Sequence, residues 1–444
     1  MTPALPLALP WLAAILLAML DGRRRWVGWV AAAALAATAA TTAGLLAAAL
    51  AGGPQATVSG DWPRGVGIVL AADPLGAAFA LLSTLVILAA VVFEVLSGVV
   101  SRSFPALALF LCAGLTGLFV TGDVFNFYVF FELSMIAAYA LSTYGEQARQ
   151  LGAALIFAVV NLLGSFVFLL AVAALYHVTG TLEMTEVAGR VAELGTPVTA
   201  PIGVAILVAL SVKLGLFPFH FWLPSVYASV RPGVAAILGG ALANIGAYGV
   251  IRFGAGIFPE LLIEGAGLLV VLGAASILYG SIQAVARRTA AEVLAYSSIA
   301  QVGYVLVALA LAGPVGVAAA VLYALVNGLN KGLLFLSAEV RGRFVAAAFA
   351  IGALSVAGVP PSAGFLAKLA VFRATVDESA VLLAIVVFLG SALSFLYMLQ
   401  IYQHDFWRGE RSGPRAGGAV RALVLGAGVV VLALGAWPQP LLEV

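Results

Sequence analysis

The sequence predicts an all-α membrane protein of about 14 transmembrane helices, with two inverted five-helix repeats and two broken helices. Its composition indicates a lipid environment, because 64% of the 444 residues are hydrophobic and only 9% are charged. About a quarter of the residues in a soluble domain are charged. The apolar runs are long and rich in Ala, Leu and Val, and they do not alternate with polar residues as the strands of a membrane barrel do.

The lengths of these runs define the spans, since a bilayer core of ~30 Å needs about 20 apolar residues for each crossing. Short polar turns separate most spans, and the longer connections are 52–72, 177–198 and 403–418. The predicted spans are 4–20, 26–51, 73–99, 104–121, 123–143, 151–176, 199–222, 232–253, 261–281, 292–312, 314–338, 345–372, 379–402 and 419–437.

The arginines predict the orientation in the membrane. Connections after odd-numbered spans hold Arg23, Arg24, Arg25, Arg102, Arg149, Arg231, Arg287, Arg288, Arg341, Arg343, Arg408, Arg411, Arg415 and Arg421. Connections after even-numbered spans hold Arg64, Arg190, Arg252 and Arg373. Cytoplasmic connections carry an excess of basic residues. We therefore expect the odd connections in the cytoplasm and both termini on the outer face of the cell membrane.

Every lysine of the chain and one glutamate of the fifth span fall within apolar runs, at Lys213, Lys331, Lys368 and Glu132. A charge at the centre of a membrane helix costs about 2.5–3.5 kcal/mol on insertion scales, so such residues usually serve a function. Lysine also suits a proton carrier, because a buried amine can release its proton whereas arginine stays charged. The alternative interpretation is structural ion pairing between helices, although buried pairs seldom stabilise more than packed apolar side chains.

Prolines are expected to interrupt two of the spans that carry a lysine. Pro218 follows Lys213 closely, and Pro360 and Pro361 precede Lys368. Proline lacks the backbone N–H that a helix needs and clashes with the preceding turn. Broken helices at corresponding places in two halves are typical of transporters built from inverted repeats. The alternative is that these prolines only kink helices for packing.

A second similarity supports an internal repeat. The segments 157–169 and 323–336 align, with Asn161 opposite Asn327 and Ser165 opposite Lys331. We therefore expect the fourth to eighth spans and the ninth to thirteenth spans to be two copies of one unit. The predicted division is 1–103 as an N-terminal three-helix segment, 104–253 and 261–402 as the repeats, and 403–444 as a cytoplasmic loop with a last helix.

Other polar residues carry weaker signals. His220 lies in the proline-interrupted stretch FPFHFWLP, where it would either pass protons to Lys213 or hydrogen-bond the freed backbone. Asp123 is expected to cap the helix that follows it. Glu94 is placed near a cytoplasmic helix end, where its side chain is expected to reach toward water, outside the main path. Cys112 is the only cysteine and the three histidines are scattered, so we expect no metal or other cofactor.

Several segments resemble a known family. TGDVFNFYVFFELSMIAAYAL, VKLGLFPFHFWLPSVY, AYSSIAQVGYVLVAL, NKGLLFLSAEV and AGVPPSAGFLAKL are similar to the antiporter-like subunits of respiratory complex I, membrane-bound hydrogenases and Mrp-type cation/proton antiporters. GDVFNFYVFFE and HVTGTLEM most resemble the D subunit of the Mrp type. The resemblance implies 14 helices with inverted repeats, and a proton path through Glu132, Lys213, Lys331 and Lys368.

Some positions depart from the pattern of that family. The basic pair that often precedes LAYSSI is replaced by Ala291 and Glu292, and two further departures fall on the expected path. Asn244 stands where the family usually has Lys or His, and Asn327 stands where a histidine often precedes the lysine at 331. Asparagine does not take up a proton, so water would have to bridge Lys213 to Lys331. Either the path is hydrated with fewer titrating groups, or it is partly disabled.

These observations predict a proton-translocating subunit of an Mrp-type Na⁺/H⁺ antiporter rather than an enzyme. Its expected partners are other membrane subunits, the lipid bilayer, H⁺ and Na⁺, with no nucleic acid. One alternative is a proton-pumping subunit of a membrane-bound hydrogenase or of a complex I-type NADH-quinone oxidoreductase. Another is a scaffold subunit that conducts nothing.

Overall fold

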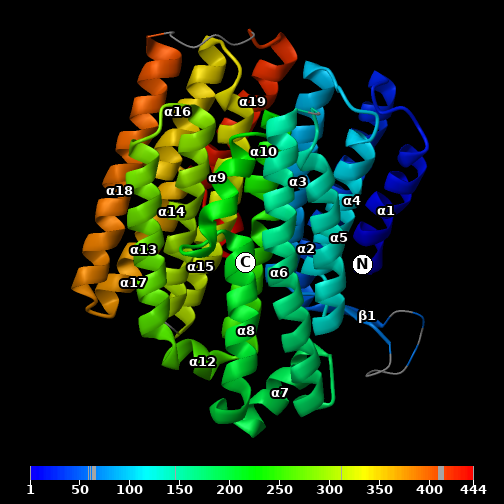
Figure 1. Cartoon of the computed structure of the whole chain (residues 1–444), viewed down its shortest axis with the longest axis vertical. Coiled ribbons are helices and arrows are strands. Elements are labelled where there is room, and N and C mark those ends of the chain that lie inside the picture. The colour runs from blue at the N-terminus through cyan, green and yellow to red at the C-terminus, as the bar shows by residue number, and fades with distance from the viewer. Residues whose placement is uncertain are drawn as a thin grey trace. The chain divides into compact units, whose positions relative to one another are not determined.

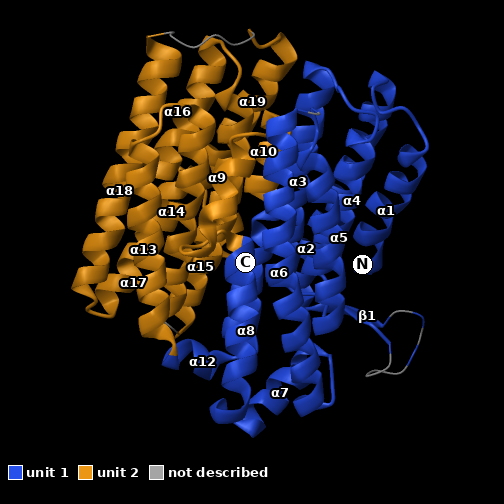
Figure 2. Cartoon of the chain, in the orientation of Figure 1, with its two compact units in different colours: residues 1–213, 242–264, 444 blue, residues 214–241, 265–443 orange. Residues whose placement is uncertain are grey.

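The computed structural model describes residues 2–58, 60, 62, 67–145, 147–311, 313–408 and 415–443. The chain forms two compact units, which Figure 2 shows in different colours. Unit 1 comprises residues 1–213, 242–264 and 444, and unit 2 comprises 214–241 and 265–443. Arg64 and Arg411, two of the arginines that predict the orientation, lie outside the described residues.

Unit 1 holds most of the N-terminal half of the chain (Figure 1). Its helices and strands are α1 (Ala4–Ala18), α2 (Arg25–Gly52), β1 (Gln55–Val58), β2 (Val69–Ala72), α3 (Pro74–Ser97), α4 (Phe104–Phe119), α5 (Val124–Ser142), α6 (Ala148–Thr179), α7 (Met184–Leu194), α8 (Thr196–Leu214, whose last residue falls in unit 2), α11 (Asn244–Gly256) and α12 (Pro259–Glu264). Asp123 caps α5 as predicted, since its Oδ1 accepts from the backbone N–H of Asn126 at 2.6 Å.

Unit 2 holds the remaining helices. They are α9 (Trp222–Tyr227), α10 (Pro232–Ala236), α13 (Ala266–Val285), α14 (Ala290–Ala310), α15 (Gly313–Ala338), α16 (Arg343–Ala357), α17 (Ala363–Asp377), α18 (Val381–Tyr402), α19 (Gly418–Ala436) and α20 (Gln439–Leu442). Glycine lets two of them approach closely: a Cβ on Gly273 of α13 would lie 2.9 Å from the carbonyl oxygen of Gly303 on α14. Small residues serve this purpose at membrane helix interfaces.

Within the described residues, eleven helices are long and apolar enough to cross a membrane. Shorter apolar helices at Ala4–Ala18, Phe104–Phe119 and Arg343–Ala357 coincide with three more predicted spans. The protein is therefore a multi-pass membrane protein by length and composition of its helices, while the count of 14 and the inverted repeats stay predictions.

Two connections predicted as loops contain regular structure. Strands β1 and β2 pair antiparallel within 52–72, with Gln55 opposite Ala72. In 177–198, α6 continues to Thr179 and α7 follows. The three buried positions of α7 are Met184, Val187 and Val191, which is the spacing of an amphipathic helix. A search for long apolar runs passes over such a helix, because its other face is charged.

Backbone hydrogen bonds hold connections of unit 1 together. At one end, Gly22 N–H donates to the carbonyl of Arg102 at 2.9 Å, joining the connections after α1 and α3. Elsewhere, Gly122 N–H donates to Val69 at 2.9 Å and Met184 N–H donates to Gly122 at 2.8 Å. These bonds join the connections after α2, α4 and α6. Connections that follow odd-numbered helices therefore bond to one another, and so do connections that follow even-numbered helices. This is expected when successive helices cross the membrane in alternating directions, because the two kinds of connection then lie on opposite faces.

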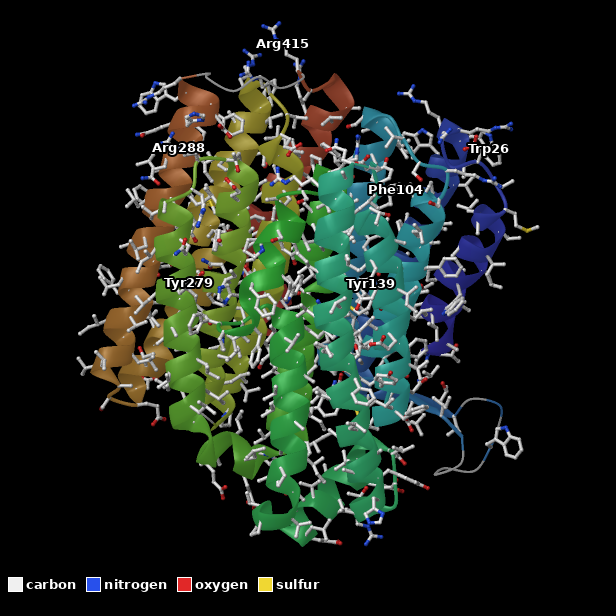
Figure 3. The ribbon with its side chains drawn as sticks, viewed as in Figure 1. Trp26, Phe104, Tyr139, Tyr279, Arg288 and Arg415 are labelled. Carbon is white, nitrogen blue, oxygen red and sulfur yellow. The ribbon has the colours of Figure 1, made fainter. Side chains whose placement is uncertain are left out.

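Unit 2 shows the same grouping among its odd-numbered connections. Ala416 N–H donates to the carbonyl of Arg341 at 3.0 Å, and Arg341 and Arg415 form a β-bridge. In Figure 3, Arg288 and Arg415 both lie toward the upper end of this unit, whereas Tyr279 lies near its middle. Arginines of different odd connections therefore share one end of the unit. Which end faces the cytoplasm stays a prediction.

Two helices are interrupted where the prolines predicted. α8 ends at Leu214, and Gly215, with a φ of +64°, precedes Pro218 and a short 3-10 helix at Phe219–Phe221 that leads into α9. α16 ends at Ala357, and Gly358 follows in the left-handed region with a φ of +83°. The chain resumes as α17 at Ala363. A π-helical segment at Ile237–Leu242, which the sequence did not predict, joins α10 to α11.

Candidate functional site

Lys213 lies in the last turn of α8 and is 7% exposed. Its Nζ donates to the backbone carbonyl of Asn161 at 2.8 Å and to Oγ of Ser165 at 2.9 Å, both on α6. The ammonium also lies 4.0 Å from the centroid of the Phe131 ring on α5. A cation over an aromatic face is attracted to the electron-rich ring. Three neutral groups from two neighbouring helices therefore surround this ammonium.

Glu132 follows Phe131 on α5 and is partly buried. Its Oε1 is shielded from solvent and has no hydrogen-bond partner among the described residues. The ion pairs that these residues form do not join Glu132 to Lys213, although the two charges interact through space. The carboxylate of Glu132 therefore acts on the Lys213 ammonium electrostatically but does not form an ion pair with it.

Asn161 and Ser165 are the residues that the internal similarity singled out. The hydroxyl of Ser165 donates to the carbonyl of Asn161 at 2.9 Å, so this carbonyl accepts from both Ser165 and Lys213. The Asn161 side-chain nitrogen donates to the carbonyl of Phe157 at 2.9 Å. The sequence indicated a repeat at these positions, but it did not indicate that they bind a lysine.

Lys331 lies on α15 and is fully buried, with 0% of its surface exposed. Its Nζ donates to Oγ of Ser297 at 2.8 Å and to the carbonyl of Leu294 at 3.2 Å, both on α14. No carboxylate is among these partners, so this ammonium is also held by neutral oxygens.

Lys368 lies on α17 and is 6% exposed. Its Nζ lies 4.8 Å from the centroid of the Tyr304 ring and 3.5 Å from Oγ of Ser394 on α18, to which it donates. Beside it is a cavity of ≈ 10 Å³ whose lining includes Asn327 and Asn330, about the space that a single water needs. The Oδ1 atoms of both asparagines have no hydrogen-bond partner among the described residues, so this cavity is polar.

Asn244 stands at the first turn of α11 and is 4% exposed. Its side-chain nitrogen donates to Oγ of Ser83 on α3 at 3.2 Å. The amide therefore links two helices of unit 1.

His220 lies in the 3-10 helix of the first interruption, between two aromatic rings. The ring centroids of Phe217 and Tyr279 are 5.4 Å and 4.5 Å from that of the imidazole. Nδ1 of His220 is shielded and has no hydrogen-bond partner among the described residues. The ring is therefore positioned by aromatic packing, and its role in proton transfer stays a prediction.

Glu94 differs from its expected setting. A side chain at the helix end was expected to reach toward water, but Glu94 is 0% exposed. The hydroxyl of Tyr144 donates to its Oε2 at 3.0 Å, and the same hydroxyl accepts from the N–H of Val100. Tyr144 follows the end of α5, and the packing of this connection against the end of α3 places its hydroxyl on the carboxylate, which the sequence alone did not indicate.

The predicted residues fall into two groups. Unit 1 holds Glu132, Lys213 and Asn244, and unit 2 holds His220, Asn327, Lys331 and Lys368. Among the residues that the structure describes, no three His, Cys, Asp or Glu side chains are placed to hold a metal ion. What the sequence missed are the hydroxyl partners of the lysines, because serine and tyrosine in apolar helices are common packing residues.

These features define a polytopic membrane protein that keeps ionisable side chains inside a bundle of apolar helices, with two of those helices interrupted. Residues 121–394 match the family model described as NADH:quinone oxidoreductase/Mrp antiporter, TM. The chain belongs to this family, and the resemblance predicted from its motifs is confirmed.

Relatives from both branches of the family are similar to this chain. It is 31% identical over 440 residues to the D subunit of the Na(+)/H(+) antiporter of Bacillus subtilis, covering 93% of this chain and 88% of the relative. It is 35% identical over 426 residues to the N subunit of the NADH-quinone oxidoreductase of Desulforudis audaxviator, covering 85% and 84%.

Two solved structures are also similar to this chain over almost its whole length. A chain in the Mrp complex from Dietzia sp. DQ12-45-1b matches with a TM-score of 0.91 and 28% identity, covering 99% of this chain and 95% of that one. A chain in respiratory complex I from Thermus thermophilus matches with a TM-score of 0.81 and 27% identity, covering 99% and 98%. Both neighbours belong to multi-subunit membrane complexes, which supports the expectation that this chain has other membrane subunits as partners.

Proposed function

We propose that this chain is a proton-translocating subunit of a multi-subunit Na⁺/H⁺ antiporter of the Mrp type. The observation that carries the proposal is the setting of its three lysines. Each is at most 7% exposed, and the hydrogen bonds of each ammonium go to neutral oxygens. A purely structural buried charge needs a paired counter-charge to offset its desolvation. A buried lysine that forms no ion pair is suited to gain and lose a proton.

In this proposal Glu132 controls Lys213. An ion pair at 4 Å stabilises the charged lysine by about 4 kcal/mol at an effective dielectric of 20, enough to decide whether Lys213 keeps its proton. When the carboxylate is drawn away, desolvation favours release. The hydrogen bonds of Lys213 to the neutral oxygens of Asn161 and Ser165 fit the state in which Glu132 and Lys213 are not paired.

The released proton then passes to Lys331, to Lys368 and to the outer face. Asn244 and Asn327 contribute polar surface along this route but do not themselves take up a proton. His220 passes protons from the cytoplasmic side to Lys213. The driving force comes from partner subunits through Na⁺ movement. The predicted orientation, with both termini outside, sets the direction of proton entry and exit.

A second candidate is a proton-pumping subunit of a redox-driven complex. The 35% identity to the N subunit of an NADH-quinone oxidoreductase and the likeness to a complex I chain favour it. Such a complex would contain iron–sulfur or flavin subunits, whereas an antiporter would contain membrane subunits alone.

One experiment separates the two candidates. The complex is purified with its partners, its subunits are identified, and it is reconstituted into liposomes that carry a pH-sensitive dye. We expect an imposed Na⁺ gradient to move protons and the partners to lack redox centres. Co-purification of redox subunits, with no proton movement under a Na⁺ gradient, would establish the second candidate instead.

A further inference from the structure

A tyrosine joins the serine partners of Lys331 and Lys368 in unit 2. The hydroxyls of Ser297 and Tyr397 are 3.0 Å apart, and Tyr397 donates to Oγ of Ser394 at 3.1 Å. Ser297 accepts from Lys331 at 2.8 Å and Ser394 accepts from Lys368 at 3.5 Å. Four consecutive contacts therefore connect the two amines through three hydroxyl groups, without an intervening acid or histidine.

We propose that Ser297, Tyr397 and Ser394 form a proton wire between Lys331 and Lys368. The inference rests on the proposed function, because a wire has meaning only if the two lysines exchange protons. It supplies only the step from Lys331 to Lys368, and the step from Lys213 to Lys331 still requires water because Asn244 and Asn327 do not titrate. The three hydroxyl side chains are fully buried, so bulk water does not compete for their hydrogen bonds.

The transfer balances as a series of proton hops. The Lys331 ammonium gives a proton to Ser297 Oγ as the Ser297 proton moves to the Tyr397 oxygen and the Tyr397 proton moves to Ser394 Oγ. The Ser394 proton, which now points to the carbonyl of Gly390 at 2.7 Å, turns to a neutral Lys368 amine. Lys331 loses one proton and Lys368 gains one, and every hydroxyl ends neutral. A hydroxyl both donates and accepts and can rotate between partners.

Gln301 fixes the centre of the wire. Its Nε2 donates to the Tyr397 oxygen at 3.1 Å and to Ser394 Oγ at 3.4 Å, while its Oε1 accepts from the hydroxyl of Tyr323. The amide nitrogen of Gln301 is a donor and accepts no hydrogen bond from Tyr397. The hydroxyl proton of Tyr397 is therefore left to point to Ser394. Gln301 is thus a positioning residue, and Tyr323 lies on a branch that does not connect the lysines.

The test removes one oxygen atom from the wire. Tyr397→Phe keeps the ring and deletes the hydroxyl, and Tyr227→Phe is the matched control because it deletes a buried hydroxyl of the same unit that donates to the carbonyl of Leu238, outside this network. We expect Tyr397→Phe to lower Na⁺-driven proton transport in liposomes at least tenfold, with assembly unchanged, and Tyr227→Phe to keep most of it. Lys331→Ala, measured alongside, is expected to be inactive.

The outcomes separate the wire from the proposed function. If Tyr397→Phe transports like the wild type while Lys331→Ala is inactive, the wire is wrong and the proton leaves Lys331 by another route. If Lys331→Ala also transports normally, the proposed function itself fails. Should Tyr397→Phe not assemble, Ser297→Ala and Ser297→Thr make the same comparison, since only threonine keeps a hydroxyl; equal transport by these two variants would also overturn the wire.

Discussion

The lysine ammonium groups are bound by neutral groups from neighbouring helices. Lys213 has a carbonyl, a hydroxyl and an aromatic ring around its ammonium, and Lys331 has a carbonyl and a hydroxyl. Hydrogen bonds to a charged group contribute about 1.5–3 kcal/mol each, less than the cost of burying an isolated ion. The balance therefore leaves these amines able to exchange a proton.

Ser165 provides a test of this balance at Lys213. Ser165→Ala removes the one side-chain hydrogen bond to its ammonium and leaves the Asn161 carbonyl in place. We expect proton transport by the assembled complex in liposomes to fall several-fold. Ser211→Ala is the control, because Ser211 lies on α8 two residues before Lys213 but donates to the carbonyl of Leu207. Equal rates in the two variants would show that Ser165 does not tune Lys213.

At the scale of residues, the sequence predicted which charged side chains are buried. It predicted few of their hydrogen-bond partners. Lysine in an apolar run is conspicuous because its burial is costly. Ser297 and Tyr397 are 100 residues apart in sequence, and neither is unusual in a membrane helix, so their pairing depends on how α14 and α18 pack. The burial of Glu94 under Tyr144 depends in the same way on how the connection after α5 packs against the end of α3.

At the scale of elements, the second interruption is built to place Lys368. Gly358 adopts a φ of +83°, and a Cβ there would lie 2.7 Å from Cδ of Lys368. Gly364 N–H donates to Ser355 Oγ at 3.0 Å, which ties the start of α17 to the last turn of α16. The glycine therefore both turns the chain and leaves room for the lysine.

Gly358→Ala is expected to affect stability and transport together. A left-handed alanine destabilises by about 1–2 kcal/mol, and the new methyl group displaces Lys368. Gly180→Ala is the matched control, since Gly180 also ends a helix with a φ of +71° but has open space around a Cβ. Thermal unfolding in detergent should show similar losses for both variants, and only Gly358→Ala should lose proton transport. Loss of transport in both would assign the effect to backbone strain.

The sequence predicted the elements that lipid dictates. Long apolar runs and prolines located the spans and both interruptions, because hydrocarbon tolerates few other structures. The amphipathic α7 and the β1–β2 hairpin were missed, since their patterns are short and are settled by contacts such as Met184 N–H to the Gly122 carbonyl.

At the scale of the whole molecule, the family assignment and the multi-pass architecture agree with the sequence. The grouping of odd and of even connections in unit 1, and of odd connections in unit 2, fits alternating crossings. The orientation in the membrane and the division into repeats at 104–253 and 261–402 stay predictions. The orientation depends on the bilayer and on the partners, which composition and helix length reflect only indirectly.

The central claim is that buried lysines carry protons, and Lys213 tests it most directly. Lys213→Arg keeps the positive charge but does not release a proton, and Lys213→Ala removes both. Na⁺-driven proton uptake into liposomes is measured for the assembled complexes. We predict that both variants assemble and that both lose proton uptake. Wild-type uptake by Lys213→Arg would make the lysine a structural charge, and wild-type uptake by both would make the subunit a scaffold.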